Sequence, residues 1–507
     1  MKERLDATPV EETAPSAPSA PSAPSASPEI NENPWAIDSS WPDSVALDGI
    51  ILDRDTVADL VAEFFHHYHP HFPILGDGRD LLISQPPSSL LFWTVMMIAS
   101  RTCPGRRPLY ASLTAAVRQR AALMPSPREQ SLPVIIALLL LCYWPPPFDA
   151  RDQDDSWTYA GMAVTYALRR GLHRPLHAGD FIYQPEGDEM ETRRRTTVWL
   201  GCFIVSQSVG VLHGLPPLLQ PNHCVRTMLA SPPVWLPPVL HFYLRIAHET
   251  HRACSMLGDD LASSNGLLSR PGTLMRMLDA DLRAWEASEG AHWSRAWRQS
   301  LLATRLRVYC FALVDSSDDG SRALFLSSAY TAAMSVLQLA SESQDHVPYW
   351  SIFQEKEILD SIFVLLKLVS QQGTEMENMF DRDAARRLIG QTWALLKSQS
   401  QTPRDHLGRI CAVIDFLLNK ERNTDEDGPA RPGQQVTARL SSNAMVDGIW
   451  RARDRFSQAV RAQRPVDYTA ASDAVNGLSG QNDAFLHSPN WEAMLNEWAM
   501  DLAEFGL

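Results

Sequence analysis

The sequence predicts an all-α fold, a large array of many helices. From Asp53 onward, apolar residues recur every three or four positions, which is the spacing of one helix face. Alternating runs of β-branched residues, which would indicate strands, are almost missing. Breaks such as "WPPPFDA" and "LSRPGT" divide the apolar stretches into single-helix lengths.

The helices can be placed in order from these stretches and breaks. We expect helices over 54–68, 87–102, 108–123, 131–143, 156–170, 190–212, 236–257, 272–287, 292–316, 320–342, 354–371, 383–399, 404–420 and 441–461. Four regions follow from this pattern: a disordered leader over 1–52, a helical domain over 53–420, a polar linker over 421–489 that contains the helix near 441–461, and a terminal segment over 490–507. The leader contains "APSAPSAPSAPSASP", which cannot bury enough apolar surface to offset its ordering entropy.

Composition and charge restrict the function. Of the 507 residues 45% are hydrophobic, which suits a large core, and the net charge of −14 argues against a bare nucleic-acid groove. The seven widely spaced cysteines are typical of buried thiols in an intracellular protein. No secretory signal opens the chain, and the longest apolar run, "VIIALLLLCYW", is too short for a membrane span. We therefore expect a soluble protein of the nucleus or cytoplasm.

Four histidines lie close together in "AEFFHHYHPHFPILGDG": His66, His67, His69 and His71. Pro70 ends helical geometry there, and no cysteine or second histidine pair nearby completes a metal site. We expect rings at the edge of the core that hydrogen-bond to the backbone.

Two further patterns look chemical. "HETH", His248 to His251, is one residue shorter than the zinc motif H-E-x-x-H, so we expect a polar helix face. "DQDD" carries Asp152, Asp154 and Asp155 and matches the acid motif of some helical terpene cyclases. The aspartates precede "SWTYAGMAV", however, where carboxylates accept from free N–H groups at a helix start, so we favour capping.

The helix that follows reads "SWTYAGMAVTYALRRGLHRPL". Its apolar face includes Trp157 and Gly161, and we expect another helix to approach closely at Gly161. Gly171 fits a helix C-cap.

This stretch resembles the central regulatory region of fungal zinc-cluster transcription factors, whose marker is a Ser-Trp helix that ends in Gly-Leu-His-Arg. The first marker is here Gly171, Leu172, His173 and Arg174. "ETRRRTTVWLGCFIVSQSVGVLHGLPPLL" resembles the family's second marker, with Arg193, Arg194, Arg195, Trp199, Gly214 and Pro216. The resemblance covers roughly residues 53–420 and leans toward the branch that includes regulators of leucine biosynthesis and secreted proteases.

The resemblance implies several structural features. The histidine stretch would be an entry corner of the domain, with Phe72, Ile74 and Leu75 packed inward. The three arginines would pair with internal carboxylates between helices. The family's zinc cluster uses C-x-x-C pairs, and the sequence contains none, so we expect no cofactor in this chain, and zinc only in a missing upstream module.

The last residues, "NWEAMLNEWAMDLAEFGL", place Trp491, Leu495, Trp498, Leu502 and Phe505 on one stripe of an acidic helix. We interpret this segment as an activation helix that folds into a hydrophobic groove of a coactivator. The alternative is a terminal helix that docks on the protein's own core.

We therefore expect a nuclear transcriptional regulator whose helical domain responds to an effector. Its expected partners are coactivators, a small-molecule effector, and a second copy or a zinc-cluster protein, with DNA contacted only indirectly or through a missing module. One alternative is an adaptor or dimerisation partner that does not bind DNA. A distant alternative is a terpene-cyclase-like enzyme that uses Asp152, Asp154 and Asp155.

Overall fold

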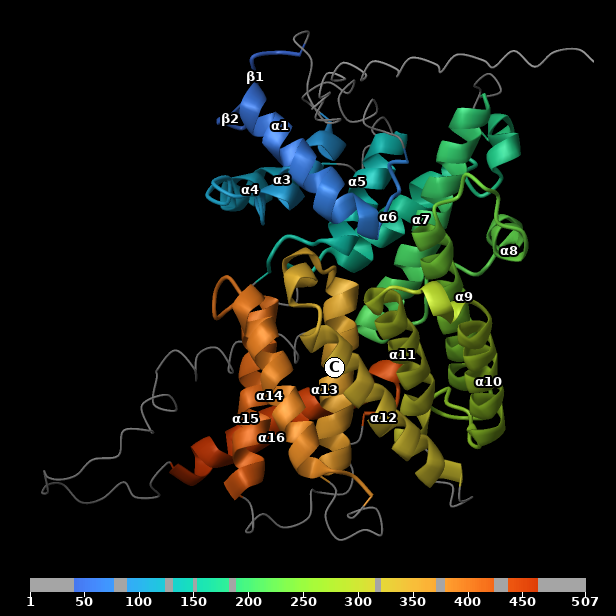
Figure 1. Cartoon of the computed structure of the whole chain (residues 1–507), viewed down its shortest axis with the longest axis vertical. Helices are drawn as coiled ribbons and strands as arrows, with labels where there is room; N and C mark the ends of the chain where they lie inside the picture. The colour runs from blue at the N-terminus through green and yellow to red at the C-terminus, as the bar shows by residue number, and fades with distance from the viewer. Residues whose placement is uncertain are drawn as a thin grey trace, which may run out of the picture.

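The all-α fold is confirmed by a computed structural model (Figure 1). The structure describes residues 41–76, 89–123, 131–148, 153–181, 188–314, 321–370, 379–423 and 436–463. Its α-helices are α1 (Arg54–Glu63), α3 (Leu90–Ser100), α4 (Leu109–Ala122), α5 (Leu132–Tyr143), α6 (Ser156–Arg169), α7 (Glu189–His213), α8 (His223–Ala230), α9 (Pro238–Gly258), α10 (Gly272–Glu289), α11 (Arg295–Tyr309), α12 (Ser321–Ser341), α13 (Ile352–Val369), α14 (Arg382–Gln399), α15 (His406–Asn423) and α16 (Asn443–Gln463). Apart from the short helix α8, each of them overlaps a predicted helix.

The predicted leader is too long, because its last residues form a hairpin. Strands β1 (Ser44–Leu47) and β2 (Ile50–Asp53) pair antiparallel through a two-residue turn. Asp48 and Gly49 both have positive φ, 50° and 85°, as a type I′ turn requires. The alternate residues Val45 and Leu47 are buried against the first helices, so the hairpin belongs to the domain. Residues 1–40 lie outside the described residues.

The predicted entry corner is confirmed. Helix α1 ends at Glu63, and the chain continues as a π-helical turn, η1 (Phe64–Tyr68), and a 3-10 turn, η2 (His69–His71). Beyond it Phe72, Ile74 and Leu75 are buried, and the ring of Phe72 stacks on Tyr143 at 4.3 Å. The corner therefore ties the start of the domain to α5.

Two hydrophobic clusters fill the interior. The first joins the hairpin and α1 to α8 with the start of α9, and the second joins the rest of α9 to α16. Figure 1 shows α1 and α3 to α6 at one end of the molecule and α10 to α16 at the other. Helix α7 packs on both α6 and α9, while α13 contacts α5 and α7 as well as α12 and α16. Helices α7, α9 and α13 therefore connect the two halves.

Helix α7 is the longest of the described helices. Its N-cap Asp188 accepts from the N–H of Glu191, and it ends at Gly214, whose φ of 64° lies in the left-handed region. Within the described residues, α7 and α12 are long and apolar enough to cross a membrane, and 83% of the apolar window of α7 is buried against other helices. This burial is what a core helix shows.

The predicted polar linker is also wrong in part, because its central residues belong to the domain. Helix α15 extends to Asn423, beyond the predicted boundary at 420. The 3-10 turn η9 (Leu440–Ser442) and α16 pack on α7 and α13. Ala444 and Ala452 lie in the second cluster, and Asp447 pairs with buried Lys367 at 3.1 Å. The polar composition of this segment did not reveal that it packs on the domain, because small residues and paired charges make the contacts. The terminal segment, 490–507, lies outside the described residues.

Candidate functional site

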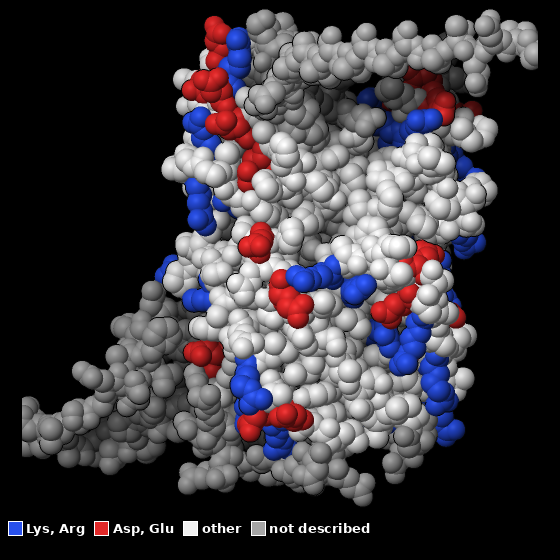
Figure 2. All heavy atoms as spheres, viewed as in Figure 1, with Lys and Arg blue, Asp and Glu red and all other residues white. Residues whose placement is uncertain are grey.

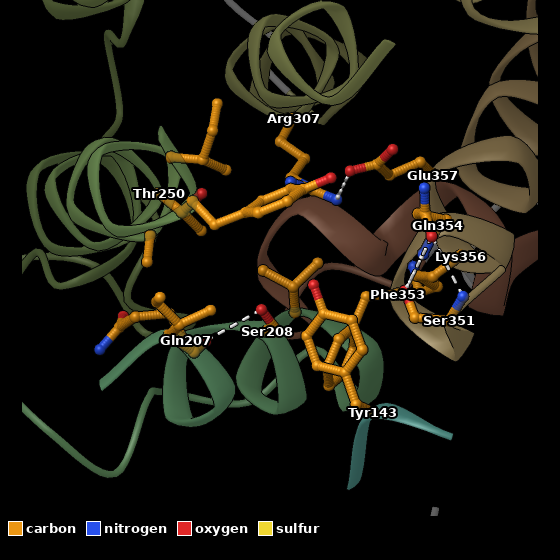
Figure 3. Close-up of a pocket in the computed structure, with 15 residues that line it drawn as sticks. Tyr143, Gln207, Ser208, Thr250, Arg307, Ser351, Phe353, Gln354, Lys356 and Glu357 are labelled. Atoms are coloured by element: carbon orange, nitrogen blue, oxygen red, sulfur yellow. Dashed lines mark hydrogen bonds and ion pairs between the residues drawn. The ribbon is translucent and has the colours of Figure 1, made fainter. Parts of the chain in front are cut away.

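The candidate site is a polar cavity where the connecting helices meet (Figure 3). It encloses about 40 Å3, room for a few water molecules. Helix α7 contributes Gln207 and Ser208, α9 contributes Tyr243 and Thr250, and α11 contributes Arg307. The start of α13 supplies the other charged side chains, Lys356 and Glu357.

Helix α13 positions charges inside the protein. Ser351 and Gln354 form a reciprocal capping box at its start, which fixes the first turn. From there "EKE" and the apolar run that follows are buried together. Each charge in this segment has a partner: Glu355 contacts His406 at 2.9 Å, Lys356 contacts Asp360, and Glu357 faces Arg307 at 3.9 Å. The pairs offset part of the cost of removing these charges from water.

Burial sets the electrostatics of the cavity. It lowers the pKa of Lys356 below its usual value, although the attraction of Asp360 acts in the opposite direction. It raises the pKa of Glu357, although Arg307 and the hydrogen bonds from Ser300 and Gln299 counteract the shift. Burial therefore favours the neutral forms of Lys356 and Glu357, whereas their charged partners favour the ionised forms.

Two residues that line the cavity each have a buried polar atom without a hydrogen-bond partner. These atoms are Nε of Arg307 and Oε1 of Gln207. The amide nitrogen of Gln207 donates to the carbonyl of Leu219 at 2.6 Å, which holds the side chain in place. Buried polar atoms are normally satisfied by protein, water or a ligand. The cavity thus offers a donor and an acceptor to a bound molecule.

The two markers of the predicted motif lie together. The C-cap of α6 is Arg170, and Gly171, with a φ of 70°, follows it, so the glycine ends the helix one residue beyond the predicted C-cap position. The ring of His173 lies 5.8 Å from that of Trp199 on α7. Asn222 links the two, since its Oδ1 accepts from Trp199 Nε1 at 3.2 Å and its Nδ2 donates to the His173 carbonyl at 3.4 Å. Sequence reasoning missed Asn222, although its place as the N-cap of α8 is a local signal.

Other marker residues are placed as follows. Leu172 is buried, whereas Arg174 and Pro216 are exposed. Trp157 is half-buried, with its ring 6.1 Å from His213. The close approach expected at Gly161 is wrong, because a side chain added there would meet no atom within 4 Å.

The arginine run pairs within its own helix, so the predicted pairs between helices are wrong. Arg193 bonds to Glu189 at 2.5 Å, and Arg195 bonds to Glu191 at 3.0 Å, both one turn apart on α7. Arg194 also faces Glu191, at 3.5 Å. The acidic residues of "EMETRRR" precede the arginines at the i, i+4 spacing that favours such pairs.

His66 and His67 lie at the edge of the core, as predicted for the histidine stretch. His66 Nδ1 lies 2.8 Å from the carbonyl of Ala62, and the ring of His67 stacks on Tyr349 at 4.5 Å. Burial lowers the pKa of His71 to about 4, and the nearby ring of His346 adds to the shift. Among the residues that the structure describes, no group of three or more His, Cys, Asp or Glu side chains could hold a metal ion.

The other two patterns are structural. In "HETH", buried Glu249 pairs with Arg245 at 3.0 Å and with Arg252 at 2.6 Å. Each oxygen of its carboxylate therefore has an arginine partner on the same helix. His248 lies 3.5 Å from the same carboxylate, whereas His251 Nε2 lies 3.5 Å from the hydroxyl of Ser255.

The capping predicted for the aspartates is only partly confirmed. Asp154 accepts from the N–H of Ser156 at 3.1 Å and lies 3.7 Å from His213 Nε2. Asp155 stands at the N-cap position without a capping hydrogen bond and accepts instead from the hydroxyl of Tyr159. Asp152 lies outside the described residues. Ser156 Oγ and Asp154 both approach Nε2 of His213. In a catalytic triad the nucleophile and the carboxylate contact different ring nitrogens of the histidine, so this arrangement differs from a triad.

The comparison with known proteins matches the motif region and the part of the cavity wall that α5 and α7 form. Residues 61–232 match the model of the fungal specific transcription factor domain. The domain covers α7 and both markers, which confirms the resemblance seen in the sequence. No solved structure is significantly similar to this chain.

Several curated fungal regulators are similar over a longer stretch. The SEF1 protein of Kluyveromyces lactis is 27% identical over 307 residues, which cover 59% of this chain and 27% of that relative. The transcriptional regulatory protein SEF1 of Candida albicans is 26% identical, covering 80% of this chain and 45% of the relative. Regulatory protein LEU3 of Saccharomyces cerevisiae is 22% identical, covering 82% and 53%. The predicted leaning toward one branch is supported only weakly, because the SEF1 proteins match at higher identity than LEU3. The chain spans between 27% and 53% of the length of these relatives.

Proposed function

We propose that this protein regulates transcription in the nucleus and that its helical domain binds a small polar effector in the cavity. The domain match over 61–232 and the similarity to fungal regulators support the role in transcription. The observation that carries the effector site is the pair of buried, unpartnered polar atoms, Arg307 Nε and Gln207 Oε1. A cavity built only for packing would be apolar and dry.

The cavity's chemistry favours a ligand that presents a hydrogen-bond acceptor or an anionic group to Arg307. A hydroxyl or amine on the same ligand would donate to Gln207. The enclosed 40 Å3 accommodates only a few water molecules, so any larger ligand requires a wall of the cavity to move. Binding would therefore select a more open arrangement of the helices.

Contact with DNA is proposed to come from outside the helical domain. The sequence has no C-x-x-C pair, so a zinc cluster would be supplied by a partner protein or by a module beyond residues 1–507. On the face shown in Figure 2, basic and acidic side chains of the described residues lie in small mixed groups. Such a surface gives little of the sustained positive potential that holds a phosphate backbone.

The activation segment is proposed to work through the apolar stripe that contains Trp491 and Trp498. To test it, the full chain is fused to an unrelated DNA-binding domain and expression of a reporter gene is measured. We expect activation, and we expect Trp491→Ala with Trp498→Ala to lower it to the level of the DNA-binding domain alone.

The matched control for this test changes residues of the same segment that lie off the stripe. Asn496→Ala with Met500→Ala should retain activation, provided that immunoblotting shows equal protein levels. Equal activation by both pairs of substitutions would contradict the activation-segment proposal. A fusion that never activates would instead favour the adaptor alternative.

A further inference from the structure

The segment Val436–Arg453, which we name the latch, lies against the cavity-forming helices. It comprises the turn η9 and the described part of α16. We infer that the latch is the movable cover of a hollow that adjoins the polar cavity, and that its release exposes this hollow and detaches the C-terminal part of the chain from the domain. The inference deepens the proposed function, because it names the part that an effector would displace.

Glycines form the seat of the latch. A side chain at Gly214 would place its Cβ 2.7 Å from the Arg439 carbonyl and 3.1 Å from Ser442 Cβ. A side chain at Gly258, the last residue of α9, would overlap Leu440. From the latch itself, Gly448 lies so close to α13 that an added Cβ would stand 2.5 Å from the Phe363 ring. The approaches at Gly214 and Gly448 leave no room for a side chain, whereas at Gly258 the end of the Leu440 side chain would have to move.

Polar contacts hold the latch at the same place. Ser442 Oγ donates to the carbonyl of Val211 at 2.8 Å and accepts from Lys356 Nζ at 3.2 Å. Arg439 donates to the carbonyl of His213 at 3.3 Å. Asp447 accepts from Lys367 at 3.1 Å. The contacts therefore reach the end of α7 and both ends of α13.

The latch lines a hollow that adjoins the cavity and shares three of its wall residues. Leu440 and Ser441 line it, together with Gln207, Val211 and Thr250, which line the cavity as well. The unpartnered Oε1 of Gln207 stands at this border. Departure of the latch would therefore expose this hollow and free the shared wall residues of the cavity to move. Helices α7 and α13, which form two of the other walls, are buried over most of their length, so their movement would disrupt a hydrophobic cluster.

Lys356 connects the contents of the cavity to the latch. It lines the cavity and donates to both Asp360 and Ser442. An acceptor group on a ligand would compete with Ser442 for this ammonium group and so weaken the latch. By linkage, opening of the latch would raise the affinity for that ligand by the same factor.

Hydrogen exchange of the full chain measures opening of the latch without reference to transcription. Gly448→Ala should push the latch off Phe363, so exchange of amides in 440–451 should rise at least tenfold. Amides in α3 and α5, far from the latch, should keep their rates. The matched control is Gly390→Ala on α14, where the added methyl group meets no atom within 4 Å. Because alanine favours a helix at both positions, only the contact with Phe363 distinguishes the two variants.

Each outcome decides the inference. Selective exchange in 440–451 supports it. Unchanged exchange there, or exchange that rises equally in α3 and α5, would show that α16 is a fixed helix of the core. If Gly448→Ala does not fold, Ser442→Ala provides the second measurement, because it removes the contacts to Val211 and Lys356 without adding an atom. This variant should also raise exchange of the latch selectively, and no change would overturn the inference. Transcription is not measured in either case, so a failure here leaves the proposed regulatory role to its own test.

Discussion

Gly171 and Gly214 end the two marker helices in the left-handed region, and both lie against another segment. A Cβ at Gly171 would stand 2.5 Å from the Phe181 ring, and a Cβ at Gly214 would meet Arg439. These positions therefore require glycine for backbone conformation and for space. The same reasoning does not extend to Gly161, which faces open space.

The free-energy cost of a side chain in the left-handed backbone conformation can be separated from the cost of its overlap with a neighbour. Gly105 has a φ of 74° and open space around it, so Gly105→Ala measures the backbone cost alone, about 1 kcal/mol. Gly171→Ala adds the overlap with Phe181, and we expect a loss of about 2 to 3 kcal/mol of unfolding free energy. Urea denaturation of both variants checks the order. Equal losses would show that Phe181 yields freely.

His71 should make stability depend on pH. Its folded pKa of about 4 lies below the usual 6.5, mainly because the ring is buried. A depressed histidine pKa favours the neutral form, so its contribution is full above pH 6.5 and is lost as the pH falls through 4. His71→Gln should reduce the loss of unfolding free energy between pH 6.5 and 4 by about 2 kcal/mol. An unaltered pH profile in this variant would contradict the assignment.

At the residue scale, the features that could be predicted were those that depend on the local sequence. The helix end at Gly171 and the inward packing of Phe72 follow from short-range rules and from the resemblance. The partners of Arg193 to Arg195 were misassigned, although Glu189 and Glu191 lie one turn away in the sequence. The partner of a side chain between helices depends on packing, which one sequence does not reveal.

Helix α13 is the element on which the site depends, because it carries buried charges into the cavity. Arg307 on α11 faces Glu357 at 3.9 Å, and Gln299 and Ser300 also donate to this carboxylate. Removing one partner of such a pair leaves a buried charge, which costs more than the pair itself contributes.

A double-mutant cycle tests this pair. Arg307→Leu should lower the unfolding free energy by about 3 kcal/mol, because Glu357 is then left without its cation. Adding Glu357→Gln should restore at least half of the loss, since the amide oxygen still accepts from Ser300. Chemical denaturation at pH 7 measures all three variants. Additive losses would mean that the two side chains do not interact.

Elements were predictable where periodicity is strong. The long helices, including α7 and α13, lie within a few residues of their predicted bounds. The hairpin was missed although "LDGI" contains an Asp-Gly turn between apolar residues, and α8 was missed because it has only eight residues. The cavity was not predictable, because its lining residues, from Tyr143 to Glu357, come from five helices whose convergence no local pattern records.

The whole molecule consists of two hydrophobic clusters connected by α7, α9 and α13, with the polar cavity at their junction and the latch on its outer side. A regulator needs two states of similar free energy. The latch, which packs on glycines and is held by a few polar contacts, is the element that can supply the second state. The central claim is that this arrangement restrains the C-terminal segment, 490–507, for which we propose a role in activation.

The most direct measurement compares two single variants of the full chain, each tethered to an unrelated DNA-binding domain, in a reporter assay at matched protein levels. Gly448→Ala, which pushes the latch off Phe363, should raise expression of the reporter several-fold, whereas Gly390→Ala should match the unsubstituted chain. Equal expression from all three proteins would contradict the claim that the latch restrains activation.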